Sequence, residues 1–124
     1  MLKLICIVKR QLHLSHEEFL AHWRDHHAPL IKKHSKTLGI LRYVQNSSIE
    51  NTQIQTRIEE LSGLRNVNFD GIAELWYEDL ETHLGARSTQ EGDIALREII
   101  EDEGRFVDLS CSYVWYCNEN DVIR

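Results

Sequence analysis

The 124-residue sequence has no hydrophobic run long enough to cross a membrane. Its most apolar stretch, residues 2–8, is far shorter than the roughly 20 residues that a spanning helix needs. That stretch leads into Lys9 and Arg10 rather than into a small-residue cleavage site, so we expect no signal peptide and a cytoplasmic protein. The sequence also lacks a basic stripe, and its formal net charge is −6. Both features argue against nucleic acid as a partner.

Cysteine is scarce as well. Cys6, Cys111 and Cys117 are an odd number of thiols in a chain expected in the cytoplasm, so we predict that they are reduced. We interpret them as small hydrophobic residues in strands rather than as catalytic groups. Their spacing matches no zinc site, and we expect neither a metal nor another cofactor.

A histidine-rich segment, residues 16–35, predicts an amphipathic helix. Ser15 and Glu18 have the spacing of a capping box, in which each side chain binds the other residue's backbone N–H. Pro29, the one proline of the sequence, cannot donate a backbone hydrogen bond and crowds the preceding turn. We therefore expect the helix to kink or stop near Ala28, which would leave room for a ligand.

Three histidines of this helix are expected to face different directions. On a wheel of about 100° per residue counted from Phe19, the apolar stripe is centred near 40° and His27 falls near 80°. His26 lies near 340°, on the shoulder of the stripe, and His22 lies further out, near 300°. His27 is therefore the best candidate for a pocket-facing proton carrier, with His26 second. The alternative is that His27 is a core histidine bonded to a backbone carbonyl.

The whole pattern predicts a single α+β domain over residues 1–124. Strand patterns occupy residues 2–9, 39–45, 72–77 and 110–117. A second helical region begins near residue 78, breaks around 85–88 and resumes after a second capping box at 88–91. Residues 46–68 are mostly polar and predict a long connection with a helical turn around 57–64. The resulting order is that of a ferredoxin-like βαββαβ fold, a four-stranded antiparallel sheet with both helices on one face.

Apolar and aromatic residues occupy both faces of the expected sheet. Neighbouring residues, which point to opposite faces, are both aromatic at Trp76 and Tyr77 and again at Trp115 and Tyr116. Because the helices cover only one face, the other face needs a partner chain. We predict a homodimer in which the two sheets pack face to face.

Three blocks of the sequence resemble EthD-type proteins: SHEEFLAHWRDHHAPL at 15–30, FDGIAELWY at 69–77 and EDEGRFVD at 101–108. These proteins belong to the dimeric α/β-barrel superfamily, with muconolactone isomerases, polyketide cyclases and antibiotic-type monooxygenases. The resemblance implies a dimeric α/β barrel with a ligand cavity between the sheet and helices of each protomer. His26 occupies a variable position of the signature. Five residues match it by position: His22, Trp23, His27, Pro29 and Leu30.

The residues themselves supply candidate catalytic groups. His27 can move a proton to or from a carbon next to a carbonyl, as an acid or a base. Tyr43, on the second strand, can hold the developing enolate by a hydrogen bond. Glu74, in the middle of a strand, is either a third acid or base or half of a buried ion pair with a residue such as Arg42.

Further residues are candidates for contact with a small cyclic or aromatic ligand, although such residues are also common in plain cores. Asp102 and Arg105 are interpreted as a structural pair. The substrate-binding candidates are Phe19, His22, Trp23, His26, Trp76 and Phe106.

Three functions are compatible with these residues and with the resemblance. The first is cofactor-independent acid/base chemistry of the isomerase, cyclase or dehydratase type on a small cyclic or aromatic carbonyl compound, in a catabolic or polyketide-like pathway. The second is an oxidoreductase-linked role, as a cofactor-free monooxygenase or an accessory to an oxygenase in degradation. The third is a dimer that binds a small molecule without catalysis.

Overall fold

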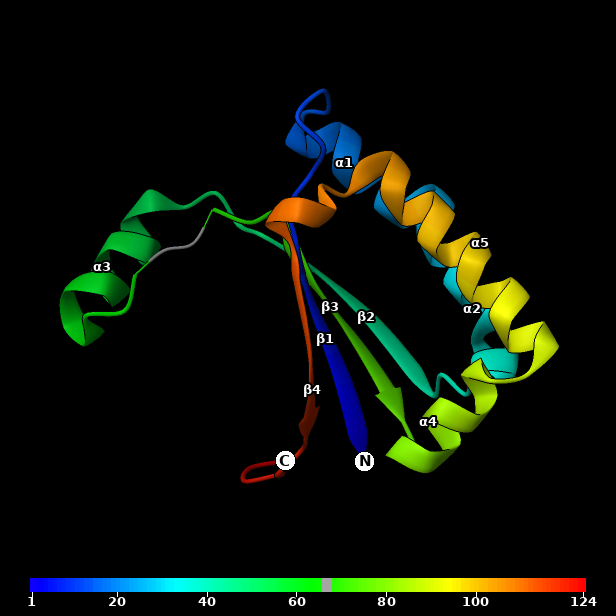
Figure 1. Cartoon of the computed structure of the whole chain (residues 1–124). Coiled ribbons are helices and arrows are strands. Elements are labelled where there is room, and N and C mark those ends of the chain that lie inside the picture. Colours follow the sequence, from blue (N-terminus) through cyan, green and yellow to red (C-terminus); the bar gives the residue numbers. More distant parts are fainter. Residues whose placement is uncertain (66–67) are drawn as a thin grey trace.

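The computed structural model describes residues 1–65 and 68–124 as a four-stranded antiparallel sheet whose main helical layer covers one face (Figure 1). In sheet order, β2-β3-β1-β4, the strands are Arg42–Ser47, Gly71–Tyr77, Leu2–Val8 and Tyr113–Asn118. The helices are α1 (His16–His22), α2 (Ala28–Leu38), α3 (Thr52–Ser62), α4 (Leu80–Arg87) and α5 (Gln90–Phe106). Two shorter turns are the π-helical η1 (Trp23–His27) and the 3₁₀-helical η2 (Leu109–Cys111). The predicted ferredoxin-like α+β fold is confirmed.

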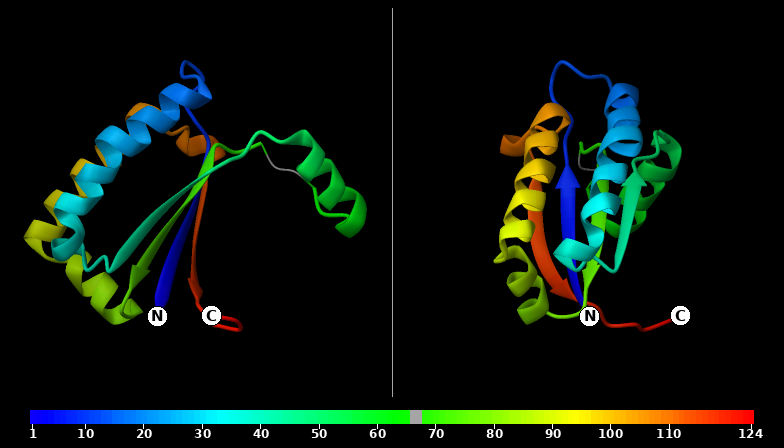
Figure 2. Two further views of the ribbon diagram at one scale, coloured as in Figure 1. Left: turned by 180° about the vertical axis from the view of Figure 1, so that it is seen from behind. Right: turned by 90° about the vertical axis from the view of Figure 1, so that its right-hand side faces the viewer.

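The helical layer consists mainly of two long helical segments that run side by side. Helices α2 and α5 pack against each other over the same face of the sheet (Figure 2). Within the described ranges, no helix combines the length and the apolar character that a membrane span requires.

The first helical segment continues past the proline instead of stopping there. The capping box at Ser15 and Glu18 is present, with both hydrogen bonds formed. At η1 the backbone widens, and the N–H of Ala28 binds the carbonyl of Trp23, five residues back. This wider turn gives the Pro29 ring the space that a regular α-helical turn would deny it. The disturbance therefore falls where it was predicted, and the helix resumes as α2 up to Leu38.

Two other element boundaries differ from the sequence expectation. Strand β2 begins at Arg42, after Gly39 ends α2 with a left-handed φ of 70°. The N-cap of α5 is Thr89, whose hydroxyl accepts from the Gly92 N–H, so the helix begins one residue later than predicted and the capping box expected at 88–91 does not form, because Gly92 has no side chain to complete it. Cys111 lies in the η2 turn rather than in a strand.

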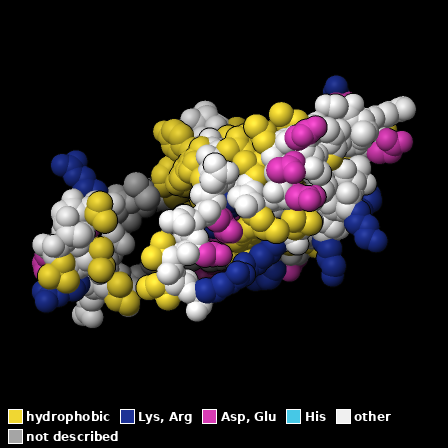
Figure 3. Space-filling model, turned by 90° about the horizontal axis from the view of Figure 1, so that it is seen from below, with side chains coloured by type: hydrophobic (Ala, Val, Ile, Leu, Met, Phe, Trp, Pro, Cys, Tyr) yellow, Lys and Arg dark blue, Asp and Glu magenta, His cyan; other side chains and the backbone are white. Residues whose placement is uncertain are grey.

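The polar connection between β2 and β3 contains a complete helix, α3, that begins before the predicted turn. Residues 66–67 of this connection lie outside the described residues. Helix α3 stands apart from the rest of the protein, on the side of the sheet opposite α2 and α5 (Figures 1 and 3). Its apolar side chains Ile54, Ile58 and Leu61 are exposed.

The strand register separates the sheet side chains into an inner and an outer face. Leu4 lies opposite Leu75 of β3 and Tyr116 of β4 and faces the helices. Ile5, one residue on, lies opposite Glu74 and Trp115 on the outer face. The outer face is therefore the one that no helix of the main layer covers.

Glu74 and Trp76 both lie on this outer face, away from the helices. Glu74 forms an ion pair with Lys3 at 2.8 Å, and Asn46 also donates to it. The Lys3 ammonium and the Arg42 guanidinium stack on the Trp76 ring at 4.5 and 4.6 Å. The expected ion pair of Glu74 is thus present, with Lys3 in place of Arg42 as its partner.

Candidate functional site

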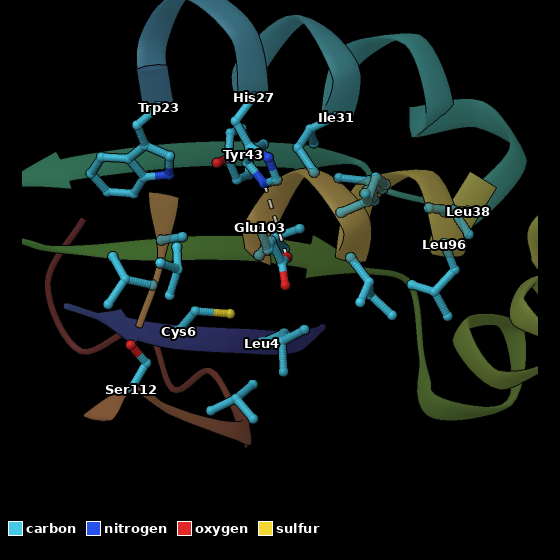
Figure 4. Close-up of a pocket in the computed structure, with 18 of the residues that line it drawn as sticks. Leu4, Cys6, Trp23, His27, Ile31, Leu38, Tyr43, Leu96, Glu103 and Ser112 are labelled. Atoms are coloured by element: carbon cyan, nitrogen blue, oxygen red, sulfur yellow. Dashed lines mark ion pairs between the residues drawn. The ribbon is translucent and has the colours of Figure 1, made fainter. Parts of the chain in front are cut away.

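A cavity of about 350 Å³ lies between the inner face of the sheet and the helical layer. Leu4 and Cys6 of β1 point up into it, and His27 and Ile31 point down from the first helical segment (Figure 4). Most of its wall is apolar, and a few polar side chains interrupt this hydrophobic lining. Those polar groups are His27, Tyr43, Tyr77, His83, Arg87, Glu103 and Ser112.

His27 is held in one orientation by a buried aspartate. The imidazole is 4% exposed, and its Nδ1 lies 2.8 Å from Oδ2 of Asp102 on α5. Because an ionised carboxylate can only accept, Nδ1 carries the hydrogen and Nε2 carries the lone pair. Nε2 is the atom that points toward Glu103, its neighbour in the cavity wall (Figure 4). The site thus presents a basic nitrogen to a ligand.

Asp102 stays ionised because three donors surround it. Burial acts to raise the pKa of its carboxyl group, but hydrogen bonds from His27, His22 and Arg105 outweigh burial and the net pKa is lowered. His22 Nε2 lies 3.0 Å from Oδ1, and Arg105 Nη1 lies 3.1 Å from the same oxygen. The predicted pair of Asp102 and Arg105 is present, but it belongs to a network centred on two histidines.

The protonation state of His27 follows from its burial. Burial lowers the pKa of His27 more than the hydrogen bond from its Nδ1 to Asp102 raises it. The imidazole is therefore neutral at neutral pH, which keeps Nε2 free to accept a proton.

Glu103 lies beside His27 in the cavity wall and was not among the candidates predicted from the sequence. Its Oε1 lies 3.9 Å from Nε2 of His27. Burial among the apolar lining, reinforced by the negative charge of Asp102, raises the pKa of Glu103 from 4.5 to about 7. Glu103 comes four residues after Ile99, so it falls on the buried stripe of α5, and this spacing was the available signal.

Tyr43, on β2, lies beside His27 and also lines the cavity (Figure 4). Gln45 Nε2 donates to its hydroxyl oxygen at 3.0 Å and to the carbonyl oxygen of Trp23 at 2.9 Å. Burial raises the pKa of the Tyr43 phenol to about 12. The hydroxyl therefore keeps its proton and can donate it to a ligand oxygen.

Trp23 and Phe106 form the aromatic part of the wall. The Trp23 ring packs so closely on Gly71 that a Cβ added there would lie 2.6 Å from the ring, so only glycine fits. The Phe106 ring lies 5.0 Å from that of His27 and limits the freedom of the imidazole. Both residues match the sequence expectation of an aromatic lining.

The structure separates seven of the nine candidate site residues into two groups. His27, Tyr43, Trp23 and Phe106 line the cavity together. Glu74 and Trp76 lie on the opposite face of the sheet, and Phe19 is fully buried against Trp23 and Phe106 without reaching the cavity. These last three residues therefore do not line the cavity.

The two remaining candidates are His22 and His26, and their burial is the reverse of what was predicted. His26, expected at the rim, is exposed and stacks on His22 with ring centroids 5.1 Å apart. His22, expected at the surface, is half-buried and supports His27 through Asp102. A helical wheel places residues relative to one helix and cannot show that α5 covers the His22 side.

Comparison with known proteins first defines the fold class. An EthD family protein from Bacillus halodurans superposes with a TM-score of 0.65, at 20% identity over 97% of this chain and 99% of that one. A dimeric protein of unknown function and ferredoxin-like fold from Bacteroides fragilis gives 0.57, at 10% identity over 95% of both chains. A putative antibiotic biosynthesis monooxygenase from Nitrosomonas europaea gives 0.52, at 11% identity over 96% and 98%. At these identities the likeness concerns the fold alone.

The sequence itself gives the family. The EthD domain matches residues 11–110, and the chain belongs to the EthD family. No curated protein matches the chain. The matched region includes η1, Tyr43, Asp102 and Glu103.

Proposed function

We propose that this protein is a cofactor-independent enzyme that performs acid/base chemistry on a small cyclic or aromatic carbonyl compound. The observation that supports the proposal is the orientation of His27: a buried imidazole whose Nδ1–H is held by Asp102 while Nε2 faces an apolar cavity. Glu103 supplies a second titratable group beside it in the cavity wall. An acid and a base of the chain itself are therefore both within reach of a ligand in the cavity.

The proposed step is a proton transfer next to a carbonyl group. Nε2 of His27 takes a proton from the carbon adjacent to the carbonyl, and the C–H electron pair becomes the double bond of an enol or enolate. Glu103, protonated in part near neutral pH, or the Tyr43 hydroxyl donates to the oxygen on which charge develops. Return of the proton to another carbon gives an isomer, and attack of the enolate on a second carbonyl gives a ring.

The cavity suits a ligand of this kind in size and polarity. Its volume of about 350 Å³ is at the lower end of small-molecule sites. The mostly aliphatic and aromatic lining lowers the local dielectric, which strengthens the hydrogen bonds made to an enolate.

We also propose that the protein works as a homodimer formed through the outer face of the sheet. Ile72, Tyr113 and Trp115 on that face are 38%, 63% and 44% exposed. Apolar side chains on a sheet face without helices favour burial against a second sheet. Light scattering coupled to size-exclusion chromatography tests this: twice the mass of the 14.6 kDa chain supports a dimer, and the mass of one chain refutes it.

The acid/base proposal is tested by proton exchange in heavy water. 1-Indanone and 2-tetralone, two small cyclic aromatic ketones, are incubated with the protein, and deuterium uptake next to the carbonyl is measured by mass spectrometry. His27→Asn keeps a donor near the position of Nδ1, so Asp102 stays paired, but it removes the basic Nε2. We expect this variant to lose about 100-fold or more of the exchange rate.

His26→Asn is the matched control, because His26 is the exposed neighbour on the same turn. It should exchange within about twofold of the wild type. Full exchange by a folded His27→Asn variant would contradict the proposal. Uptake of oxygen with the ketone, followed with an oxygen electrode, would instead favour the monooxygenase function, and binding without any exchange would favour a ligand-binding dimer.

A further inference from the structure

A second polar region lies in the cavity wall, formed by the end of β3 and by α4. Tyr77, His83 and Arg87 all line the cavity there. Tyr77 and His83 are 4% and 1% exposed, and their rings pack with centroids 4.1 Å apart. The proposed proton transfer uses none of these three residues.

The polar atoms of this region have more hydrogen-bonding capacity than the protein uses. His83 Nε2 bonds the Tyr116 hydroxyl at 2.8 Å, but Nδ1 is buried with no hydrogen-bond partner in the part of the chain that is described. The Tyr77 hydroxyl has no hydrogen-bond partner among residues 1–65 and 68–124 either, and unlike Nδ1 it is not sealed from solvent. Because the polar groups of buried residues normally find partners, a hydroxyl left open at the cavity wall is available to a ligand.

Arg87 is the decisive group, because its guanidinium has no carboxylate partner among the described residues. Arg10, Arg97 and Arg105 each pair with an aspartate or glutamate at 3.1 Å or less. Arg87 is half-buried at the cavity wall, where a guanidinium always carries its charge.

The charge of Arg87 reaches the groups around it. It acts to lower the pKa of Tyr77 and of Glu103 against the larger, opposite effect of burial, and it adds to the burial that lowers the pKa of His83. Arg87 and Glu103 also line the same cavity, so a ligand bound at Arg87 can extend toward Glu103.

We propose that Arg87, together with the Tyr77 hydroxyl, binds an anionic group of the ligand, a carboxylate or an ionised phenol. This rests on the proposed function of the cavity and narrows its substrate class to acidic carbonyl compounds. The anion on Arg87 fixes one end of the ligand, so that its carbonyl end reaches His27 and Glu103. A guanidinium suits a carboxylate because its N–H groups form two parallel hydrogen bonds with it.

A matched pair of probes tests this by binding alone, without any turnover. 2-Naphthoate and 2-acetonaphthone share the ring system and differ in a carboxylate against a methyl ketone. Affinities are measured by isothermal titration calorimetry for the wild type, Arg87→Met and Arg87→Lys. Arg97→Met is the control, because Arg97 is an exposed arginine of α5.

We expect the wild type to bind naphthoate about tenfold or more tightly than the ketone. Arg87→Met should remove that difference by weakening naphthoate alone, Arg87→Lys should keep part of it, and Arg97→Met should leave both affinities within about twofold. The proposal is overturned if the wild type binds both probes with equal affinity. It is also overturned if the wild type binds neither probe, and neither result needs a variant. An equal loss of both probes in Arg87→Met also overturns it, because the arginine would then only shape the cavity.

The two proposals fail in different ways. If naphthoate binds through Arg87 but His27→Asn keeps its proton exchange, the anion site stands and the acid/base function falls. If proton exchange depends on His27 but the two probes bind equally, the acid/base function stands and the anion site falls.

Discussion

Replacing Glu103 by glutamine should make the protein more stable and less active at the same time. Its carboxyl pKa is raised from 4.5 to about 7 by burial and by the charge of Asp102. Below pH 4.5 the group is protonated in both the folded and the unfolded chain, so Glu103 and glutamine should be nearly equivalent there. As the pH rises through 7, the unfolded chain ionises first, and the wild type loses stability that Glu103→Gln retains.

The magnitude follows from the two pKa values. The difference between 4.5 and about 7 corresponds to about 3.4 kcal/mol above pH 7. The Glu103 side chain is 36% exposed, so solvent screening reduces this to about 1–2 kcal/mol. For a domain of this size that is a rise in Tm of about 3–8 °C.

Urea unfolding at pH 4 and pH 8, at one fixed protein concentration, measures the effect. Glu101→Gln is the control, since Glu101 lies on the same helix with its side chain 73% exposed. We expect Glu103→Gln to gain stability at pH 8 only and to slow proton exchange with the ketones by about tenfold or more. A gain that is equal at both pH values, or a loss at pH 8, would refute the assignment of a buried, destabilising carboxylate.

Three further substitutions test the geometry. Asp102→Asn should slow exchange by about 100-fold, because His22 and Arg105 keep the amide oxygen and leave its N–H₂ group facing Nδ1 of His27, which favours the wrong tautomer; unchanged exchange would contradict that role. Gly71→Ala should lower the unfolding free energy by about 1–3 kcal/mol in urea titrations, because a Cβ there clashes with the Trp23 ring and with the backbone oxygen of Asn46; unchanged stability would show that both can move. Glu74→Gln should leave exchange within about twofold, since Glu74 lies on the outer face, and a large loss would place it in the site.

The sequence predicted the fold well because the fold depends on local patterns. The capping box at Ser15, the strand periodicity and the order of elements are all readable along the chain. Helix α3 begins earlier than predicted, because the side chain of Asn51 caps its N-terminus. The prediction did not use Asn51 as a start signal.

The direction of a candidate site residue could be predicted only where a single helix determines it. His27 faces inward because it lies four residues after Trp23, which the helical wheel describes correctly. His22 is more buried than His26, contrary to the prediction, because His22 bonds Asp102. Asp102 belongs to α5, about 80 residues further along the chain. Glu103 and Arg87 look like ordinary charged residues of helix surfaces, and only the packing of α4 and α5 over the sheet brings them to the cavity.

The π-helical turn η1 lets the first helical segment carry one residue more than a regular helix without changing which later side chains face the cavity. Arg24, Asp25 and His26 are exposed, so substitutions there change little of the interior. Deletion of one of them would make the Ala28 N–H and the Trp23 carbonyl an i+4 pair, so the turn would become α-helical and the later side chains would keep their direction. The Pro29 ring would then lose the wider turn that accommodates it, so the cost of the deletion would fall on the proline rather than on the cavity wall.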